Sequence, residues 1–391
     1  MKLGIIELDH HLECLNSLCQ ILAGSEHEVT IFTTQKLFSE IRERDYAAFF
    51  HWKVVEGSVA SFIQDSKESF ENQDILFFST IESHFRNFNQ LRLTVPVIAR
   101  IHNANTFLRR SFHYDLKLTP YWLFKDLSYI IRKVLLEREI LERKKFIDRC
   151  RGICFTSDEI TLHVRNHDSY RNRDRIIDAI PITFNEWEPP QKMAKPDSIA
   201  IVGTIDRKRK NYPLFLKALG NLRDRFTSTL TIRFMGRPKG SFGHRILGKA
   251  KGIQNDNLRI KTWKDGLSQD DFDAEMNQVD LLVAPIFQFT KYFLTREEYG
   301  RTKISGSIND CIKYARPGII PHFYPVPEGT ESIFLKYHDE KELEKILWEI
   351  TRGEKSISIE PDILRPFRLE AVRRKALSIL ENFYQSLEKS E

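Results

Sequence analysis

The sequence predicts an α/β protein built from two Rossmann-like domains, each a doubly wound parallel sheet. Short runs rich in Ile, Val and Phe alternate with amphipathic helical patterns, and this alternation restarts after a proline-rich polar stretch. The 391 residues are enough for two or three domains of about 150 residues each. Hydrophobic residues make up 41% and charged residues 29% of the chain, which excludes disorder as the dominant state.

The first domain is predicted to cover residues 1–188. Residues 12–23 carry apolar side chains at helical spacing and end at Gly24. Together with the apolar runs on either side, they indicate a strand, helix, strand unit of a parallel sheet. The expected strands of this domain are residues 3–8, 28–33, 74–79, 95–101, 152–157 and 175–182.

Residues 107–149 form a predicted helical insert in the first domain. Aromatic and basic side chains alternate in it, a combination that suits contact with an anionic membrane or a lipid-linked substrate. The alternative is an ordinary helical pair with a solvated charged edge. The side chains concerned are Phe107, Arg109, Arg110, Phe112, Tyr114, Lys117, Tyr121, Trp122, Phe124, Lys125, Tyr129, Arg132 and Lys133.

A linker is predicted at residues 189–197, because prolines lie among polar residues there. The second domain is expected over residues 198–365, and Pro366 opens a final helix, 366–391, that crosses back to the first domain. The expected strands are 198–202, 230–234, 258–261, 281–284, 318–320 and 333–335, and the expected helices are 212–223, 269–278, 307–314 and 340–351.

Composition narrows the classes of function. No stretch approaches the ~20 apolar residues of a membrane span, and the N-terminal apolar run is too short for a secretory signal, so we expect a cytoplasmic protein. Five scattered cysteines indicate reduced thiols rather than a disulfide framework or structural zinc. A net charge of +6 suits anionic small ligands or an anionic membrane surface, and does not indicate a dedicated nucleic-acid binder.

Two strand-to-helix junctions in the second domain have the composition of anion sites. In the first, four consecutive cations from Arg207 to Lys210 precede a helix that starts near Tyr212. A helix N-terminus presents unpaired N–H groups and partial positive charge, so Arg207 and Lys210 are candidate phosphate ligands. The alternative is a solvated charge run.

In the second junction, Lys303 precedes Ser305, Gly306 and Ser307 at another helix start, which predicts a pyrophosphate cradle. Helix capping alone would explain the serines but not the neighbouring cations. Neither junction is a GxxxxGK[ST] or GxGxxG loop, so an ordinary P-loop NTPase and a nicotinamide dehydrogenase or epimerase are disfavoured.

Residues 198–350 resemble the donor domain of GT-B glycosyltransferases, closest to glycosyltransferase family 4. The resemblance rests on a strand ending at Gly203, a lysine seven residues later, the LTIRFMG run that ends at Gly236, and the block from Glu298 to Ile320. It implies that the nucleotide or sugar lies near Gly203, Thr204, Gly236, Glu297 and Glu298. Thr204 stands where the family has a phosphate-binding Arg, which Arg207 replaces in this interpretation. The family's second glutamate, eight residues after the first, is absent, so the ribose-binding residue is unassigned.

Candidate acceptor-side residues follow two strands of the first domain. Ligands bind doubly wound sheets beyond the carboxyl ends of the strands. His102 is the candidate catalytic residue, because an imidazole exchanges protons near neutral pH and the family often has a His at this strand end. The alternative is a surface loop histidine. The other acceptor-side candidates are Asp9, His10, His11, Asn103 and Asn105, and these residues lack the ligand set of a metal site.

The resemblance implies a glycosyltransferase of the hexosyltransferase type. It would move a sugar from a nucleotide diphosphate sugar to a hydroxyl of a glycan or lipid-linked acceptor, in glycan or polysaccharide biosynthesis, without a cofactor or metal ion. We expect no nucleic-acid partner, and a cytoplasmic location with peripheral contact to the inner face of the membrane. The alternative is a noncatalytic relative that binds a sugar nucleotide or a partner protein. The sugar, base, acceptor, linkage, stereochemistry and oligomeric state stay open.

Overall fold

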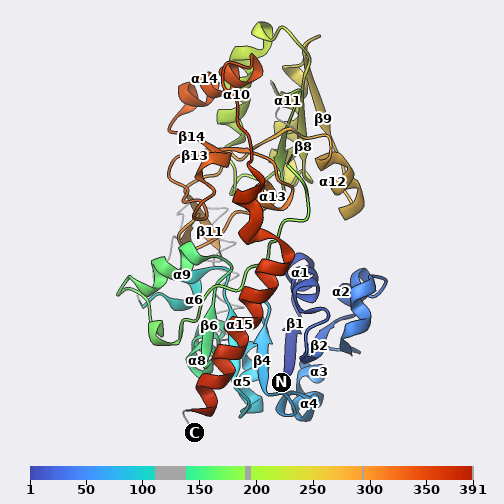
Figure 1. Cartoon of the computed structure of the whole chain (residues 1–391), viewed down its shortest axis with the longest axis vertical. Coiled ribbons are helices and arrows are strands. Elements are labelled where there is room, and N and C mark those ends of the chain that lie inside the picture. Colours follow the sequence, from blue (N-terminus) through green and yellow to red (C-terminus); the bar gives the residue numbers. More distant parts are fainter. Residues whose placement is uncertain (111–137, 190–194, 293–294, 390–391) are drawn as a thin grey trace. The chain divides into compact units, whose positions relative to one another are not determined.

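A computed structural model describes residues 1–110, 138–189, 195–292 and 295–389 (Figure 1). The chain divides into two compact units, each described by itself below. Unit 1 comprises residues 1–182, 291–297 and 369–391, and unit 2 comprises residues 183–290 and 298–368.

Unit 1 is built on a parallel sheet, in which the described residues give six strands in the order β3-β2-β1-β4-β5-β6. The strands are β1 Lys2–Glu7, β2 Glu28–Thr34, β3 His51–Val55, β4 Ile75–Phe78, β5 Val97–Arg100 and β6 Gly152–Cys154. The helices are α1 Leu12–Leu22, α2 Gln35–Ile41, α3 Val59–Asp65, α4 Lys67–Glu71, α5 Phe85–Leu91, α6 Ala104–Leu108, α8 Glu139–Arg149, α9 Asp158–Arg165 and α15 Leu369–Glu388.

The C-terminal helix α15 runs alongside α1 (Figure 1). The Arg373 guanidinium donates to the carbonyl oxygens of Gln20 and Ile21, at distances of 2.9 and 3.0 Å. These carbonyls lie at the carboxyl end of α1, where a cation is favoured. The Phe383 ring covers Gly152 of β6, where an added Cβ would lie 2.9 Å from it. The last helix is therefore part of the unit 1 core.

Unit 2 repeats the architecture, with six described parallel strands in the order β14-β13-β10-β7-β8-β9. They are β7 Ser198–Val202, β8 Leu230–Met235, β9 Leu258–Thr262, β10 Leu281–Val283, β13 Gly318–Pro321 and β14 Phe334–Tyr337. The helices are α10 Tyr212–Leu222, α11 Gly240–Gly252, α12 Gln269–Met276, α13 Gly306–Lys313 and α14 Glu340–Thr351. One core includes Phe215 and Phe234, and a second includes Met276 and Tyr314.

A two-stranded hairpin, β11 Phe289–Tyr292 and β12 Thr295–Glu298, leaves unit 2 between β10 and α13. Residues 291–297 of this hairpin belong to unit 1. These residues were expected in the second domain, because the apolar pattern that marks a domain does not report which unit a short hairpin contacts.

Several local expectations differ from the structure. Residues 175–182 are not a strand, because only Ile176 bridges Ile153 and the segment then runs irregularly. Strand β3 and helix α11 were not predicted; α11 contains four glycines, which weaken a helical pattern. Pro366 lies in a short 3₁₀ helix, so α15 begins at Leu369.

The boundary between the units falls at residues 182 and 183 rather than at 188 and 189. Asn185 explains the difference, because its side chain donates to the carbonyls of Ile312 and Lys313 at 2.9 and 3.1 Å. These hydrogen bonds attach the residues around Asn185 to unit 2. Residues 190–194 of the expected linker lie outside the described residues.

Most of the expected basic and aromatic insert, including Phe112, Tyr121 and Trp122, also lies outside the described residues. Phe107 is described and is buried, with the Arg143 guanidinium 5.3 Å from its ring centroid. This aromatic residue is therefore part of the core rather than of an exposed surface.

Candidate functional site

The loop after β7 places Lys210 at the carboxyl edge of the unit 2 sheet. The Asp206 carboxylate accepts the backbone N–H groups of Lys208 and Arg209 at 2.8 and 3.0 Å, which folds the loop back. Lys210 then forms a backbone bridge with Ile286, which follows β10. The lysine thus lies between two neighbouring strand ends, immediately before the start of α10.

Lys210 is buried, with 6% of its surface exposed. A run of four consecutive cations leads one to expect a solvent-exposed ammonium in the absence of ligand, and for Lys210 this expectation is wrong. Its ammonium faces Gly203, where an added Cβ would lie 3.3 Å from Nζ. Burial lowers the Lys210 pKa to about 8, although the charge of Asp310 acts in the opposite direction. Among the described residues no carboxylate lies within 4.0 Å of Nζ, so this ammonium has no ion-pair partner.

Glycines bring the β7 and β8 loops into contact. An added Cβ at Gly236 would lie 2.0 Å from the carbonyl oxygen of Gly203, so no side chain fits there. Gly203 itself has a φ of +87°, which favours glycine. Thr204 lies beside them and its carbonyl accepts the Tyr212 hydroxyl at 3.3 Å. Gly203 and Gly236, two of the candidate site residues, thus let the backbones of the two loops approach each other closely.

Helix α13 lies in the same unit, and the charge of Asp310 in this helix acts on Lys210. The Ser307 hydroxyl is buried, with the residue 3% exposed, and has no hydrogen-bond partner among the described residues. An added Cβ at Gly306 would meet no atom within 4 Å. Ser305 occupies the N-cap position without capping through its side chain, and its N–H donates to the Tyr324 hydroxyl at 3.0 Å.

Lys303 lies in a tight turn before α13. Its N–H donates to the Glu298 carbonyl at 3.2 Å, and its carbonyl accepts the Gly300 N–H at 2.7 Å. The Glu298 carboxylate is engaged within this loop by Gln288 and Arg301, at 3.0 and 3.3 Å. Arg207 is exposed, and its guanidinium lies 5.5 Å from the Phe242 ring centroid of α11.

In unit 1, the loops after β1 and β4 form a hydrogen-bonded acidic cluster. Asp9 accepts the Glu82 N–H at 2.7 Å and the Ser83 hydroxyl at 2.6 Å. Beneath them, Glu7 is fully buried and accepts the Thr80 hydroxyl. Burial raises the Glu7 pKa to about 7, although the Thr80 hydrogen bond and the charge of His11 act in the opposite direction.

His11 joins this cluster and stacks on the expected catalytic residue, His102, with ring centroids 5.4 Å apart. His11 Nε2 lies 3.3 Å from Glu82 Oε1. Burial lowers the His11 pKa, but hydrogen bonds with Cys14 and Glu82 outweigh it and raise the pKa to about 10. His11 is therefore an imidazolium at neutral pH. His10, its neighbour, is exposed.

Asn105 and Glu297 have partners within unit 1. The buried Glu297 carboxylate accepts the N–H groups of Asn105 and Thr106 at 3.2 and 2.8 Å, and the Thr106 hydroxyl at 2.6 Å. The Asn105 amide donates to the Arg296 carbonyl and accepts the Tyr170 hydroxyl, both at 2.8 Å. Asn103, at the N-cap of α6, is also buried. The Glu297 carboxylate thus binds the start of α6, and its expected place near the nucleotide sugar stays a prediction.

Sequence reasoning missed Glu7, Thr80, Glu82 and Ser83 in this cluster. A signal was present, because Glu7 is a carboxylate inside an otherwise apolar strand, and a glutamate is rarely buried unless other groups pair with it. The pairing of Glu82 with His11 had no local signal, because 71 residues separate them in the chain.

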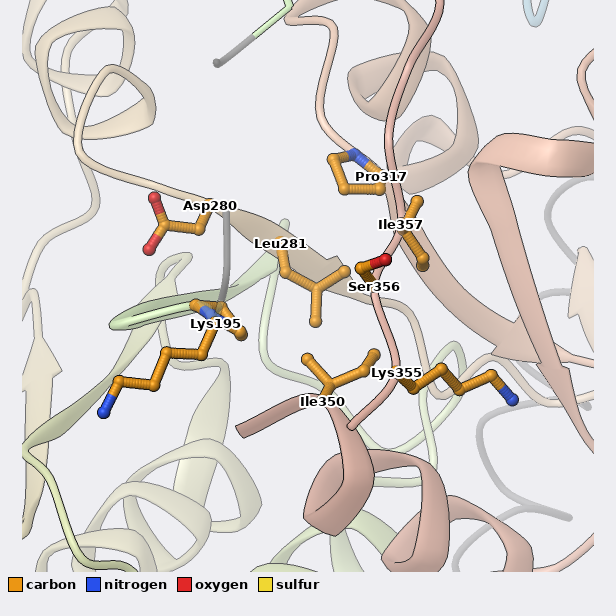
Figure 2. Close-up of a pocket in the computed structure, with 9 residues that line it drawn as sticks. Lys195, Asp280, Leu281, Pro317, Ile350, Lys355, Ser356 and Ile357 are labelled. Carbon is orange, nitrogen blue, oxygen red and sulfur yellow. The ribbon is translucent and has the colours of Figure 1, made fainter. Parts of the chain in front are cut away.

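A small pocket of about 20 Å³ lies at the amino edge of the unit 2 sheet (Figure 2). Asp280, Leu281 and Pro317 line it, and the ammonium groups of Lys195 and Lys355 point away from it. Its volume suits about one water molecule. This pocket, at the sheet edge opposite to the loops that precede α10 and α13, is therefore too small for a nucleotide.

The described residues contain no group of three His, Cys, Asp or Glu side chains placed to hold a metal ion. All five cysteines are buried free thiols. No described helix has both the length and the apolar character needed to cross a bilayer.

No protein-family model and no curated protein matches this sequence. Solved structures do match. HepE of Anabaena, in complex with UDP-glucose, superposes with a TM-score of 0.58 and 8% identity over 98% of this chain and 100% of that chain.

A point variant of TarM from S. aureus, in complex with fondaparinux, α-GlcNAc-glycerol and UDP, superposes with a TM-score of 0.57 and 8% identity. The match covers 98% of this chain and 99% of that chain. The N-terminal domain of trehalose-6-phosphate phosphatase from Candida albicans superposes with a TM-score of 0.51 and 11% identity. The match covers 100% of this chain and 96% of that chain. The chain therefore has the GT-B fold, with two Rossmann-like parallel-sheet domains. At these identities the likeness extends to the fold alone.

Proposed function

We propose that the protein is a glycosyltransferase that uses a nucleotide diphosphate sugar as donor. The observation that carries this proposal is the buried ammonium of Lys210, on which the charge of Asp310 in α13 acts. Among the described residues, this ammonium has no ion-pair partner and the buried Ser307 hydroxyl has no hydrogen-bond partner, and both groups are costly to bury unless an anion binds them. A donor diphosphate supplies the missing charge and acceptors. The UDP-glucose and UDP complexes of proteins with the same fold support this choice of donor.

In the donor site, Lys210, Lys303 and the α13 N-terminus neutralise the diphosphate. Ser307 donates its hydroxyl, and Gly306 lets phosphate oxygens approach the backbone N–H groups of α13 closely. As the bond to the sugar breaks, negative charge grows on the leaving diphosphate. Fixed donors stabilise that charge without reorganisation, which is commonly the largest catalytic contribution, about 2.7 to 4 kcal/mol for one donor. Arg207, Gly203, Thr204 and Gly236 complete this site, and no metal ion or cofactor takes part.

The acceptor hydroxyl binds at the carboxyl edge of the unit 1 sheet, where Asp9, His11, Asn103 and His102 follow the strand ends. Because His11 is already protonated at neutral pH, it cannot accept a proton from the acceptor. His102 is therefore the candidate base or hydrogen-bond partner, and Asp9 and Glu82 hold the loops around it.

Within the GT-B fold, the sequence blocks around Gly203 and Glu298 favour membership of glycosyltransferase family 4, and hexosyl transfer to a glycan or lipid-linked hydroxyl. The protein works in the cytoplasm, with the insert 107–149, apart from its buried Phe107, against the inner face of a membrane. Vesicle binding that rises with anionic lipid and falls with salt is expected, because each engaged cation contributes roughly 1 kcal/mol. Equal binding to neutral and anionic vesicles would contradict this contact.

The experiment for the donor site is titration with UDP. Lys210→Ala and Lys303→Ala should each weaken UDP binding by about 1.5 to 3 kcal/mol, the range for a hydrogen bond to a charged group. Both should also abolish release of labelled sugar from UDP-sugars. Lys251→Ala is the matched control, since Lys251 is an exposed cation at the far end of α11. If the three variants bind UDP equally, the phosphate site is elsewhere.

A second candidate function is noncatalytic binding of a sugar nucleotide. The favouring observation is Glu297, whose carboxylate is occupied by three hydrogen bonds from α6, while the family's second glutamate is missing. Under this alternative the protein binds UDP with the same dependence on Lys210, but neither hydrolyses nor transfers labelled donor sugar.

A further inference from the structure

The imidazole rings of His11 and His102 form a stacked pair at the carboxyl edge of the unit 1 sheet. Their centroids lie 5.4 Å apart, with 18° between the ring planes. Both residues are half-buried, so part of the pair is open to solvent. The ring N–H groups of an imidazole lie in the ring plane, so neither of two nearly parallel rings donates to the other. The rings therefore act on each other through charge and not through a shared proton.

His11 is bound through its ring by two neighbouring side chains. Nε2 lies 3.3 Å from Glu82 Oε1, and the ring also hydrogen-bonds with Cys14 in the first turn of α1. A carboxylate at this distance favours the charged form of an imidazole. His11 occupies the N-cap position of α1 but makes no side-chain capping bond there. Helix capping therefore does not account for the ring, whereas an ion pair with Glu82 does.

The charges near the pair act on His102 in both directions. The carboxylates of Asp9 and Glu82 favour a positive charge on His102. The Arg100 guanidinium, at the end of β5, opposes it and is bound by the carbonyl oxygen and the hydroxyl of Ser79, at 2.9 and 3.0 Å. Among the described residues, His11 is the cation that the structure places in ring contact with His102. Its charge is therefore the one best placed to offset the two carboxylates.

Two further ionisable groups belong to this edge, Glu7 of β1 and Tyr292 of β11. Burial and the charges of Glu82 and Asp9 raise the pKa of Tyr292, so its hydroxyl stays protonated, and Arg143 of α8 also acts on it. Burial raises the Glu7 pKa to about 7. Glu7 thus titrates in the same range as an ordinary imidazole, and any pH measurement on this edge needs a Glu7 control.

A stack of two imidazoles favours one charged ring and one neutral ring. Two positive charges about 5 Å apart repel each other, and partial burial strengthens that repulsion. A cation over a neutral aromatic ring is instead attracted by the π electrons of the ring. Because Glu82 and Cys14 bind His11, the charge resides on His11, and His102 is the neutral member. Without the charge on His11, the carboxylates of Asp9 and Glu82 would favour an imidazolium at His102.

We propose that His11, ion-paired with Glu82, is a positioning residue that keeps the His102 imidazole neutral and able to accept a proton from the acceptor hydroxyl. This role rests on the proposed function. In sugar transfer the hydroxyl proton moves to His102, and the acceptor oxygen bonds to the anomeric carbon. The bond from that carbon to the diphosphate oxygen breaks, and its electron pair goes to the diphosphate. A His102 that was already protonated cannot take the proton.

The test separates the charge of His11 from its ring. His11→Phe keeps an aromatic ring and removes the charge, whereas His11→Arg keeps a cation that can pair with Glu82. The Cε1–H signal of His102, assigned by its loss in His102→Gln, is followed by NMR as a function of pH. Its titration midpoint should rise by roughly one to two pH units in His11→Phe and stay near the wild-type value in His11→Arg. His51→Phe, an exposed change in β3, is the matched control and should leave the midpoint unchanged.

Equal His102 midpoints in wild type and His11→Phe would overturn the proposal. A rise of equal size in His11→Phe and His11→Arg would also overturn it, because altered packing rather than lost charge would then be the cause. His11→Gln is a second neutral variant that can still hydrogen-bond Glu82, and it should raise the midpoint as well. UDP binding checks that each variant is folded, because the proposed phosphate ligands are in unit 2.

The pH dependence of kcat/KM for sugar transfer gives a second readout. Below the midpoint of an essential base, kcat/KM falls about tenfold per pH unit. The acidic limb should therefore move to higher pH in His11→Phe by the same one to two units, which a purely structural role of His11 does not predict. Glu7→Gln removes the other group that titrates near pH 7 and should leave the limb in place. A limb that responds to Glu7→Gln and not to His11→Phe would contradict the proposal.

This inference and the proposed function fail in distinguishable ways. If wild type neither binds UDP nor transfers sugar, the proposed function fails, and the NMR titration still decides whether His11 keeps His102 neutral. If UDP binding and transfer are normal but neither the His102 midpoint nor the acidic limb responds to His11→Phe, the inference about His11 fails alone.

Discussion

The imidazole ring of His11 stacks on that of His102, with ring centroids 5.4 Å apart and an angle of 18° between the planes. The two residues follow β1 and β5, which β4 separates in the sheet. Glu82, from the loop after β4, lies 3.3 Å from His11 on this edge. Three strand ends thus converge on one imidazole pair, of which His11 carries the charge at neutral pH.

Removal of the His102 imidazole should lower the turnover number rather than the affinity for the donor. His102→Ala is expected to lower kcat for sugar transfer by about 10²- to 10⁴-fold, the contribution of a positioned acid or base. UDP affinity should not change, because the phosphate ligands are in unit 2. His51→Ala is the control, since His51 is exposed on β3 of the same unit. Equal kcat values for the two variants would exclude a proton-transfer role for His102.

The buried Lys210 should make the stability of the ligand-free protein depend on alkaline pH. Its pKa in the folded state, about 8, lies below the ordinary 10.5. Protonation is therefore disfavoured in the folded state, and the free energy of unfolding should rise between pH 8 and pH 10.5. Lys210→Met should remove this rise and stabilise the protein at pH 7 by up to about 3 kcal/mol. Urea unfolding at pH 7 and pH 10 measures both effects.

UDP provides the internal control for that measurement. A bound diphosphate restores the charged form of Lys210, so saturating UDP should reduce the rise between pH 8 and pH 10.5 in wild type and leave the Met variant unaffected. A rise of equal size in the Lys210→Met protein would assign it to another group.

Glu7 should make the free energy of unfolding fall, rather than rise, as the pH increases from 4.5 to 7. Its pKa is raised from 4.5 to about 7, so the folded state holds the proton more tightly than the unfolded state. The stability it contributes is fully present below pH 4.5 and is lost as the pH rises through 7. Glu7→Gln, which stays neutral, should be the more stable protein above pH 7, by at most about 3 kcal/mol. Denaturation midpoints at pH 5 and pH 8 should therefore differ less in the variant than in wild type. Glu28→Gln, an exposed change in β2, is the control and should show the wild-type difference.

Glu297 should hold residues 291–297 on unit 1. Glu297→Ala removes an acceptor of three hydrogen bonds and leaves the N–H groups of Asn105 and Thr106 unsatisfied. A loss of about 3 kcal/mol is expected, since each unsatisfied buried group costs about 1 to 3 kcal/mol. Hydrogen exchange should accelerate in the hairpin and at the start of α6, while β7 and β8 keep their protection. Glu328→Ala, in an exposed loop, should leave exchange unchanged. Unaltered exchange in Glu297→Ala would show that other contacts hold the hairpin.

Sugar transfer should persist in excess EDTA. The proposed donor site neutralises the diphosphate with Lys210, Lys303 and the α13 N-terminus, so chelation removes nothing that the reaction needs. The measurement is the initial rate of transfer with EDTA and after addition of Mg²⁺ or Mn²⁺. A rate that falls with EDTA and returns with either ion would contradict this site.

The sequence by itself determined the two parallel sheets and the order of their main helices. Strands such as β1 and β7 are apolar along their length because both faces are covered, and this pattern is local. The junctions before α10 and α13 were also predictable, because a helix start is encoded by neighbouring residues such as Asn211, which caps α10. Where the local signal was weak, as in the glycine-containing α11, prediction failed.

The tertiary structure decided what the site residues do. Lys210 is one of four consecutive cations in the sequence, and only the packing of the β7 and β10 loops makes it the buried one. Glu297 and Glu298 are adjacent in the sequence, yet one carboxylate binds α6 and the other binds Gln288. His11 meets Glu82 and His102 because parallel strands end at a common edge. Contacts of this kind join residues far apart in the chain, and no local pattern records them.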